Sequence, residues 1–195
     1  MKKIYCFDFD GTLTYKDTMF LFLKFYNTKR YYFQFLKHFP LFILLKMKLV
    51  SATKVKRSFI FSIIKDDTRQ NIEHKAQLFF EQNYPNLIRE NALSFIDEID
   101  REHTAMYLVS ASLDIWLKPF AERLGMNLIS TQAEFKDEKF TGRFMGKNCN
   151  GEEKVNRLQL VLKGKKYDKI IAFGDTKGDK PMLNWANKGH YRFFH

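Results

Sequence analysis

Short apolar runs alternate with longer amphipathic segments along most of the chain. Residues 3–7, 105–109 and 169–173 are apolar and rich in β-branched or aromatic residues, which predicts buried strands. Residues 86–101 and 152–162 carry apolar positions at helical spacing. Strands alternating with helices predict an α/β fold with a Rossmann-like, mainly parallel sheet and helices on both faces. The remaining predicted elements are helices over 113–124 and 181–186, strands over 126–129 and 191–194, and a β-hairpin over 132–144.

The segment from residue 17 to residue 83 does not follow this alternation. It lacks glycine, contains one proline, Pro40, and has a mostly helical pattern. We expect Pro40 to break a helix and Asp66-Asp67-Thr68 to begin another. The segment is best placed as a helical cap inserted after the first strand. The predicted domains are a core of residues 1–15 and 86–195 and a cap of residues 16–85.

Composition narrows the class of protein. Hydrophobic residues make up 45% of the chain, which excludes a disordered protein. The two cysteines, Cys6 and Cys149, form neither a disulfide framework nor a zinc-binding spacing, so we expect a reduced, cytoplasmic protein. Asp8 and Asp10 interrupt the apolar run at the N-terminus, which argues against a signal peptide.

The positive charge is concentrated in the predicted cap. The formal net charge is +11, yet the stretch from Thr18 to Lys65 has no Asp or Glu and holds ten basic residues and twelve Phe and Tyr residues. Such a field attracts phosphorylated substrates, nucleic acid or an anionic membrane surface. The longest uncharged apolar stretch, residues 39–45, is far below the roughly 20 residues that cross a bilayer, but it could lie in a membrane interface.

Polar residues follow three predicted strands. Asp8, Ser110 and Asp175 stand at carboxyl ends, where open parallel sheets bind their ligands. Asp8 and Asp10, two residues apart in a turn, suit Mg²⁺ and also a division into nucleophile and general acid/base. Gly11 permits the tight turn. Taken alone, the same pattern is equally typical of an Asp-rich turn without chemistry.

Four motifs, in order, make the chain resemble the haloacid dehalogenase superfamily. The order of elements is similar to the subgroup of phosphoserine phosphatases, which carry a helical cap of the first subclass. The resemblance extends over residues 3–182. The motifs are Asp8-Phe9-Asp10-Gly11-Thr12-Leu13-Thr14, Leu108-Val109-Ser110, Lys154 after Asn150-Gly151-Glu152-Glu153, and Gly174-Asp175-Thr176-Lys177-Gly178-Asp179.

The resemblance implies a role for each motif. Asp8 would be the nucleophile and Asp10 the general acid/base. Mg²⁺ would lie between Asp8, the backbone carbonyl of Asp10 and Asp175, with Asp179 supporting the metal site. The phosphoryl group would be bound by Ser110, Gly11, Thr12 and Lys154, whose charge would also assist catalysis.

Each assignment also has a plainer alternative. Ser110 could simply end a strand, and Ser112 is a rival that we rank lower because it lies beyond the predicted strand end. Lys154 could be a surface lysine. Asp179 could be the N-cap of the helix that follows it.

The substrate stays open at this level. Phosphoserine phosphatases have an acidic residue early in the cap, and Asp17 is the only candidate here, which disfavours phosphoserine. A basic, aromatic cap suits an anionic or lipid phosphate such as phosphatidylglycerophosphate, with peripheral contact to an anionic membrane. Three alternatives remain: a cap whose aromatics form its own core, a phosphoserine phosphatase-like enzyme on a small soluble metabolite, and an inactive binding module. The sequence has no nucleic-acid motif, so no nucleic-acid partner is expected.

Overall fold

A six-stranded sheet forms the centre of the protein, in the order β4-β3-β2-β1-β5-β6. The computed structural model describes residues 2–65 and 67–195. Neighbouring strands are parallel except for β3 and β4. The predicted mainly parallel α/β fold is therefore confirmed. The strands are β1 (Lys3–Phe7), β2 (Thr104–Leu113), β3 (Asn127–Lys136), β4 (Lys139–Met145), β5 (Lys169–Gly174) and β6 (Lys188–Tyr191).

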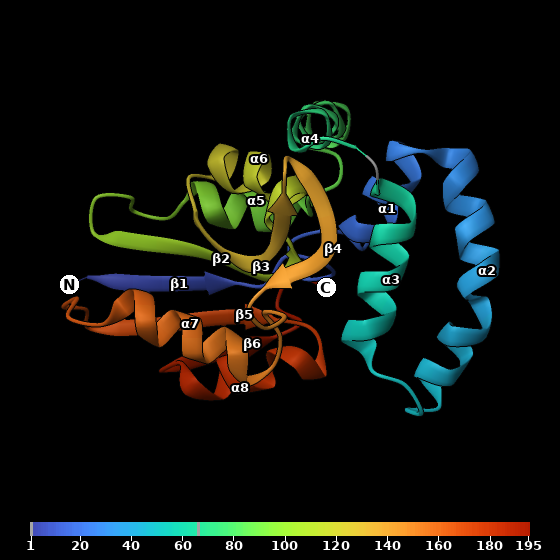
Figure 1. Cartoon of the computed structure of the whole chain (residues 1–195). Coiled ribbons are helices and arrows are strands. Elements are labelled where there is room, and N and C mark those ends of the chain that lie inside the picture. The colour runs from blue at the N-terminus through green and yellow to red at the C-terminus, as the bar shows by residue number, and fades with distance from the viewer. Residues whose placement is uncertain (1, 66) are drawn as a thin grey trace.

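Helices cover both faces of the sheet. On one face lie α5 (Glu90–Asp97) and α6 (Asp114–Leu124), and on the other α7 (Glu152–Leu162) and α8 (Lys180–Trp185) (Figure 1). Because side chains alternate along a strand, β1 contributes to two cores. Phe7 joins the core on the α5 side, whereas Ile4 and Cys6 join the core on the α7 side.

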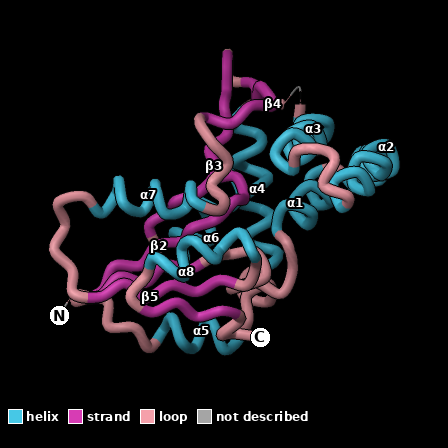
Figure 2. Tube along the Cα trace, turned by 90° about the horizontal axis from the view of Figure 1, so that it is seen from below, coloured by secondary structure: helices cyan, strands magenta, loops and turns pink. Residues whose placement is uncertain are grey.

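Four helices lie between β1 and β2 in the chain: α1 (Thr18–Tyr26), α2 (Thr28–Lys46), α3 (Ala52–Ile64) and α4 (Arg69–Asn83). Figure 1 shows α1, α2 and α3 beyond the carboxyl end of β1, and Figure 2 shows the same three helices grouped to one side. In contrast, α4 packs against α6. We call residues 18–83 the helical insertion; its division from the core at residues 16 and 85 stays a prediction.

The two connections between core and insertion run side by side. Thr14 pairs with Ile88 in an antiparallel bridge. The Tyr15 N–H donates to the Leu87 carbonyl at 3.1 Å, and the Arg89 N–H donates to the Leu13 carbonyl at 2.8 Å. The insertion is thereby tied to the turn that carries Asp8 and Asp10.

Three sequence-based expectations about the helices need correction or comment. Pro40 does not break a helix but lies inside α2, because packing of α2 on α3 offsets the lost backbone hydrogen bond. The helix predicted over 86–101 covers only α5, because residues 87–89 bond to the segment after β1 instead. Helix α4 begins after its N-cap Thr68, while Asp66, part of the predicted helix start, lies outside the described residues.

The strand predictions also shift at their ends. β2 continues through Ser110 to Leu113, and β3 joins the predicted third strand to the first arm of the hairpin, whose turn lies at Asp137 and Glu138. The last strand is β6, not residues 191–194. Phe194 instead stacks on the ring of Phe173, because burial of its own ring in the aromatic core is favourable.

Within the described residues, no helix combines the length and the apolar character needed to cross a membrane.

The aromatic core beneath the strand ends provides a stability test. The Phe173 ring is 1% exposed and stacks on Phe7 with centroids 4.9 Å apart. We expect Phe173→Ala to lower the free energy of unfolding by about 3–5 kcal/mol, because it removes a buried ring and leaves a cavity. Urea denaturation followed by circular dichroism measures the loss. Leu160→Ala, at a position 73% exposed, is the control; equal losses in both variants would contradict this account of the core.

Candidate active site

The carboxyl ends of β1, β2 and β5 bring the predicted site residues to one edge of the sheet. Phe7 pairs with Leu108 on one side and with Phe173 on the other, so β1 and β5 end at nearly the same level, while β2 continues past them to Leu113. The Asp8 N–H donates to the Phe173 carbonyl at 2.9 Å, which fixes Asp8 directly after β1. Asp175 follows β5 at the same edge.

Three carboxylates form a compact cluster there. Asp8, Asp175 and Asp179 each offer an oxygen, and these atoms all lie within 4.8 Å of one another. The Thr12 hydroxyl lies 2.9 Å from both Asp8 Oδ2 and Asp175 Oδ1. Asp179 is held by Thr176, whose N–H and hydroxyl donate to Asp179 Oδ2 at 2.9 and 2.7 Å. Clustered carboxylate oxygens suit a hard divalent cation.

Position 11 requires a glycine, both because of its backbone conformation and because of the atoms that surround it. Its φ is +84°, a conformation that favours glycine. A Cβ atom built there would lie 2.6 Å from Asp175 Oδ2, so a side chain at position 11 would displace a member of the carboxylate cluster.

Lys154 supplies the positive charge at the floor of the site. Its Nζ donates to Asp8 Oδ1 and to Asp179 Oδ1, both at 2.6 Å, and to the Val109 carbonyl at 2.8 Å. It is 1% exposed, which excludes the alternative of a surface lysine. Burial acts to lower the pKa of Lys154, but the charges of Asp8 and Asp179 outweigh burial and hold that pKa above its ordinary value.

The carboxylates respond to burial differently. Burial raises the pKa of Asp8 to about 7, and the charge of Lys154 opposes this shift only in part. Burial also acts to raise the pKa of Asp179, but Lys154 outweighs it and keeps the pKa below its usual range. Of these two carboxylates, Asp8 is therefore the one that needs further positive charge to stay ionised at neutral pH.

The Asp10 side chain is not a member of the carboxylate cluster and has other hydrogen-bond partners. Its Oδ1 accepts from the N–H and hydroxyl of Thr18 at 2.7 and 2.5 Å, at the start of α1. Its Oδ2 accepts from the Ser112 hydroxyl at 2.6 Å and from the Ser110 hydroxyl at 3.4 Å. The predicted metal contact of Asp10 concerns its backbone carbonyl and stays a prediction.

The structure removes the reason for ranking Ser112 below Ser110, while the choice of Ser110 as the serine that binds phosphate stays a prediction. Because β2 runs on to Leu113, Ser112 lies within the strand and two residues from Ser110. Both side chains line the same cavity, and Ser112 makes the shorter hydrogen bond to Asp10. The sequence could have indicated this, because side chains alternate along a strand and residues two apart lie on the same side.

A cavity of about 320 Å³ opens above these residues. Its polar side comes from the core and includes Asp8, Asp10, Asp179, Lys154 and both serines. Gly11, Thr12 and Asp175 lie outside its lining, so a phosphate contact by Gly11 and Thr12 stays a prediction. The apolar side comes from the insertion and consists of Met19, Phe20, Phe42, Leu45, Ala52, Val55 and Phe59.

Lys56 lines this cavity and was missed by the sequence reasoning. Its Nζ donates to the Ala111 carbonyl at 2.6 Å. Burial lowers the pKa of Lys56, although Asp10 and Asp17 oppose the shift. Helical spacing in the sequence could have indicated this position, because Lys56 precedes the buried residues Phe59 and Ile60 by three and four positions.

Asp17 also lines the cavity. Its Oδ1 caps α1 by accepting from the Met19 N–H at 2.9 Å. Burial and the charge of Asp10 raise the pKa of Asp17 to about 6, while Lys56 opposes the shift. Asp17, directly before the insertion, and Lys56, within it, thus both interact electrostatically with Asp10.

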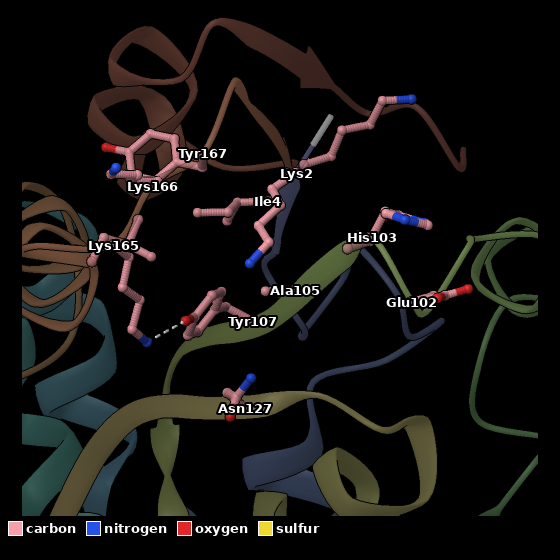
Figure 3. Close-up of a pocket in the computed structure, with 13 residues that line it drawn as sticks. Lys2, Ile4, Glu102, His103, Ala105, Tyr107, Asn127, Lys165, Lys166 and Tyr167 are labelled. Carbon is pink, nitrogen blue, oxygen red and sulfur yellow. Dashed lines mark hydrogen bonds between the residues drawn. The ribbon is translucent and has the colours of Figure 1, made fainter.

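A second cavity, of about 450 Å³, lies at the opposite edge of the sheet (Figure 3). It is lined by Lys2, Lys3 and Lys165, and the Lys165 ammonium donates to the Tyr107 hydroxyl at 3.1 Å. The predicted site residues are all described, and none of them lines this cavity. The cavity at the carboxyl edge is therefore the candidate active site.

The sequence model of the haloacid dehalogenase-like hydrolases matches residues 6–184, a span that contains every residue of the carboxylate cluster and Lys154. The chain belongs to this family. Among curated proteins, this haloacid dehalogenase-like hydrolase is similar to Protein CicA of Caulobacter vibrioides (strain NA1000 / CB15N). The two are 36% identical over 190 residues, which cover 96% of this chain and 85% of that protein.

Solved structures show the same fold. A protein of unknown function from Bordetella pertussis Tohama I superposes with a TM-score of 0.84 at 19% identity, covering 95% of this hydrolase and 87% of that chain. A substrate-bound phosphoserine phosphatase superposes with a TM-score of 0.67 at 20% identity, covering 95% and 83%. The likeness confirms the predicted phosphoserine phosphatase-like architecture.

The ion pairs of Lys154 lead to a pH-dependent stability prediction. Lys154→Met leaves two buried carboxylates without their cation, so we expect a loss of about 3–5 kcal/mol near pH 8. The loss should shrink near pH 5, because Asp8, with a raised pKa, is then neutral in the folded protein and needs no countercharge. Urea denaturation at both pH values measures this. Lys163→Met, at an exposed position after the same helix, is the control; a pH-independent loss would contradict the assignment.

Proposed function

We propose that this hydrolase is a Mg²⁺-dependent phosphomonoester hydrolase that acts through an aspartyl-phosphate intermediate. The observation that carries the proposal is the position of Asp8, which contacts Lys154 on one side, belongs to the three-carboxylate cluster on the other, and lines the cavity. The fold likeness to phosphoserine phosphatases supports the phosphatase class.

The charge balance of the cluster fits a divalent cation. Of the three clustered carboxylates, those of Asp8 and Asp179 form ion pairs with the Lys154 ammonium, and that of Asp175 adds a further negative charge. Mg²⁺ would be held by oxygens of these acids and by the backbone carbonyl of Asp10. When bound, it neutralises charge on the phosphoryl oxygens and so lets an anionic nucleophile approach an anionic substrate.

The reaction then follows from the positions of Asp8 and Asp10. A carboxylate oxygen of Asp8 forms a bond to phosphorus as the bond to the ester oxygen breaks, and Asp10 gives the departing oxygen a proton. Asp10, now a base, takes a proton from water, whose oxygen attacks phosphorus and releases Asp8 and inorganic phosphate. Ser112 and Thr18 orient the Asp10 carboxylate for both steps. Ser110 and Lys154 stabilise the phosphoryl oxygens.

The lining of the cavity indicates the class of substrate. Opposite the polar floor stand apolar side chains and the Lys56 ammonium, all from the insertion. This combination suits a phosphate ester with a second anionic group or an apolar portion, such as phosphatidylglycerophosphate. A small zwitterionic phosphate of the phosphoserine type is the second candidate, because Asp17 also faces the cavity and could pair with an ammonium group.

The central test is hydrolysis of p-nitrophenyl phosphate with and without Mg²⁺. We expect activity only with Mg²⁺, and a fall of at least about 10³-fold in Asp8→Asn, because the nucleophile is lost. Asp97→Asn, at an exposed position on α5, is the matched control and should keep full activity. Inactivity of the wild type on a broad panel of phosphate esters, or full activity of Asp8→Asn, would refute the proposal.

The role of Lys56 can be tested by comparing substrates. We expect Lys56→Met to lower kcat/KM about 10- to 100-fold more for a phosphate ester with a second anionic group than for p-nitrophenyl phosphate, because one charge-assisted contact is lost. Lys54→Met, on the exposed side of the same helix, controls for the general field of the insertion. Equal losses of kcat/KM on both substrates would mean that Lys56 does not bind the second anionic group.

A further inference from the structure

Helix α2 is apolar on two opposite sides. Its inner side packs on α3, where Tyr31, Phe35 and Phe42 surround the ring of Phe59. Its outer side carries large apolar residues three or four positions apart, which form one continuous stripe along the helix. This outer apolar face consists of Tyr32, Phe33, Leu36, Phe39, Ile43 and Met47, which are 47% to 74% exposed.

Such a face is unusual for a helix at the surface. An amphipathic surface helix turns polar residues outward, and a helix that is apolar all round is normally buried. Figures 1 and 2 both show α2 at the outer edge of the insertion, with α3 on its inner side. No element of the described chain therefore covers the outer apolar face, and a contiguous exposed apolar patch marks an interaction site.

The surrounding charges identify the partner. Exposed lysines flank the face at Lys29, Lys37, Lys46 and Lys48, and no acid occurs from Thr18 to Lys65. A second copy of the chain would bring these like charges together across a two-fold interface, which is unfavourable. A surface of anionic lipid, in contrast, offers negative head groups to the lysines and an apolar layer to the aromatic side chains.

The same helix reaches the candidate active site. Phe42 and Leu45 line its cavity, while Phe39 and Ile43 belong to the outer apolar face. The cavity therefore lies one helix diameter from the surface on which the outer face would dock.

We infer that α2 docks on an anionic membrane surface through its outer apolar face and flanking lysines. Docking brings the cavity to the level of the lipid head groups, so the preferred substrate is an amphiphilic phosphate ester held in the membrane. The statement about substrate rests on the proposed function, whereas the docking itself does not.

Flotation of the full chain with lipid vesicles tests the docking. We expect the protein to float at low salt with phosphatidylcholine vesicles that contain phosphatidylglycerol, and to float less as salt rises. Phe33→Gln with Leu36→Gln should lower the bound fraction at least about tenfold, because it removes apolar contact. Lys37→Glu with Lys46→Glu should also lower it and weaken its salt dependence.

A matched pair of substitutions controls for apolar exposure elsewhere. Leu78→Gln with Leu160→Gln alters two exposed leucines on α4 and α7 and should leave flotation unchanged. Circular dichroism and p-nitrophenyl phosphate hydrolysis establish that each variant is folded.

The possible results separate docking from catalysis. Absence of flotation at low salt overturns the docking, as does unchanged flotation of the Phe33→Gln, Leu36→Gln variant. A dimer in light scattering that this variant converts to a monomer would assign the face to a second copy and also overturn it. Flotation by Asp8→Asn would support docking independently of turnover, and a wild type that floats but hydrolyses nothing would refute only the proposed function.

Discussion

The buried ammonium group of Lys154 is the interaction on which the site depends. It ties together Asp8 after β1, the carbonyl of Val109 in β2, and Asp179 after β5. The ammonium group of Lys154, which lies on α7, thus connects three separate strands at one point. Burial of so many charges is tolerable only because each has a partner within hydrogen-bonding distance. The arrangement leaves a surplus of carboxylate, which is the electrostatic basis for expecting a divalent cation beside it.

The helical insertion completes the site as well as covering it. Thr18, at the start of α1, binds Asp10, and Lys56 from α3 reaches the Ala111 carbonyl in β2. The bridge between Thr14 and Ile88 holds the two connecting segments together at the base of the insertion. Orientation of Asp10, the proposed acid/base, is therefore coupled to the position of α1. A displacement of α1 would change the hydrogen bonds of the Asp10 carboxylate, because the N–H and the hydroxyl of Thr18 both donate to it.

The composition of the insertion serves two surfaces at once. Its aromatic residues form the packing between α2 and α3, as expected for a small helical unit, and they also continue onto the solvent side of α2. Core packing and surface exposure are compatible, because different residues of α2 serve each purpose. Phe42 packs inward, while Phe33 and Leu36 face outward. The distinction between an aromatic core and an aromatic surface is visible only once the helix has a defined rotation.

The sequence by itself determined the α/β class, the place of the insertion, and the residues that the strand ends would bring together, because hydrophobic periodicity and polar strand ends are local signals. Asp8 and Asp175 follow from that logic, whereas Lys154 was expected only from the resemblance to the family. The tertiary structure decided what depends on long-range contact. Pro40 stays helical because α3 supports α2, residues 87–89 are extended because they bond to the segment after β1, and Ser112 faces Asp10 because β2 runs past its apolar part. Lys56 lines the cavity for the same reason. The packing of α3 sets which of its side chains face the cavity, and no local pattern of charge predicts that packing.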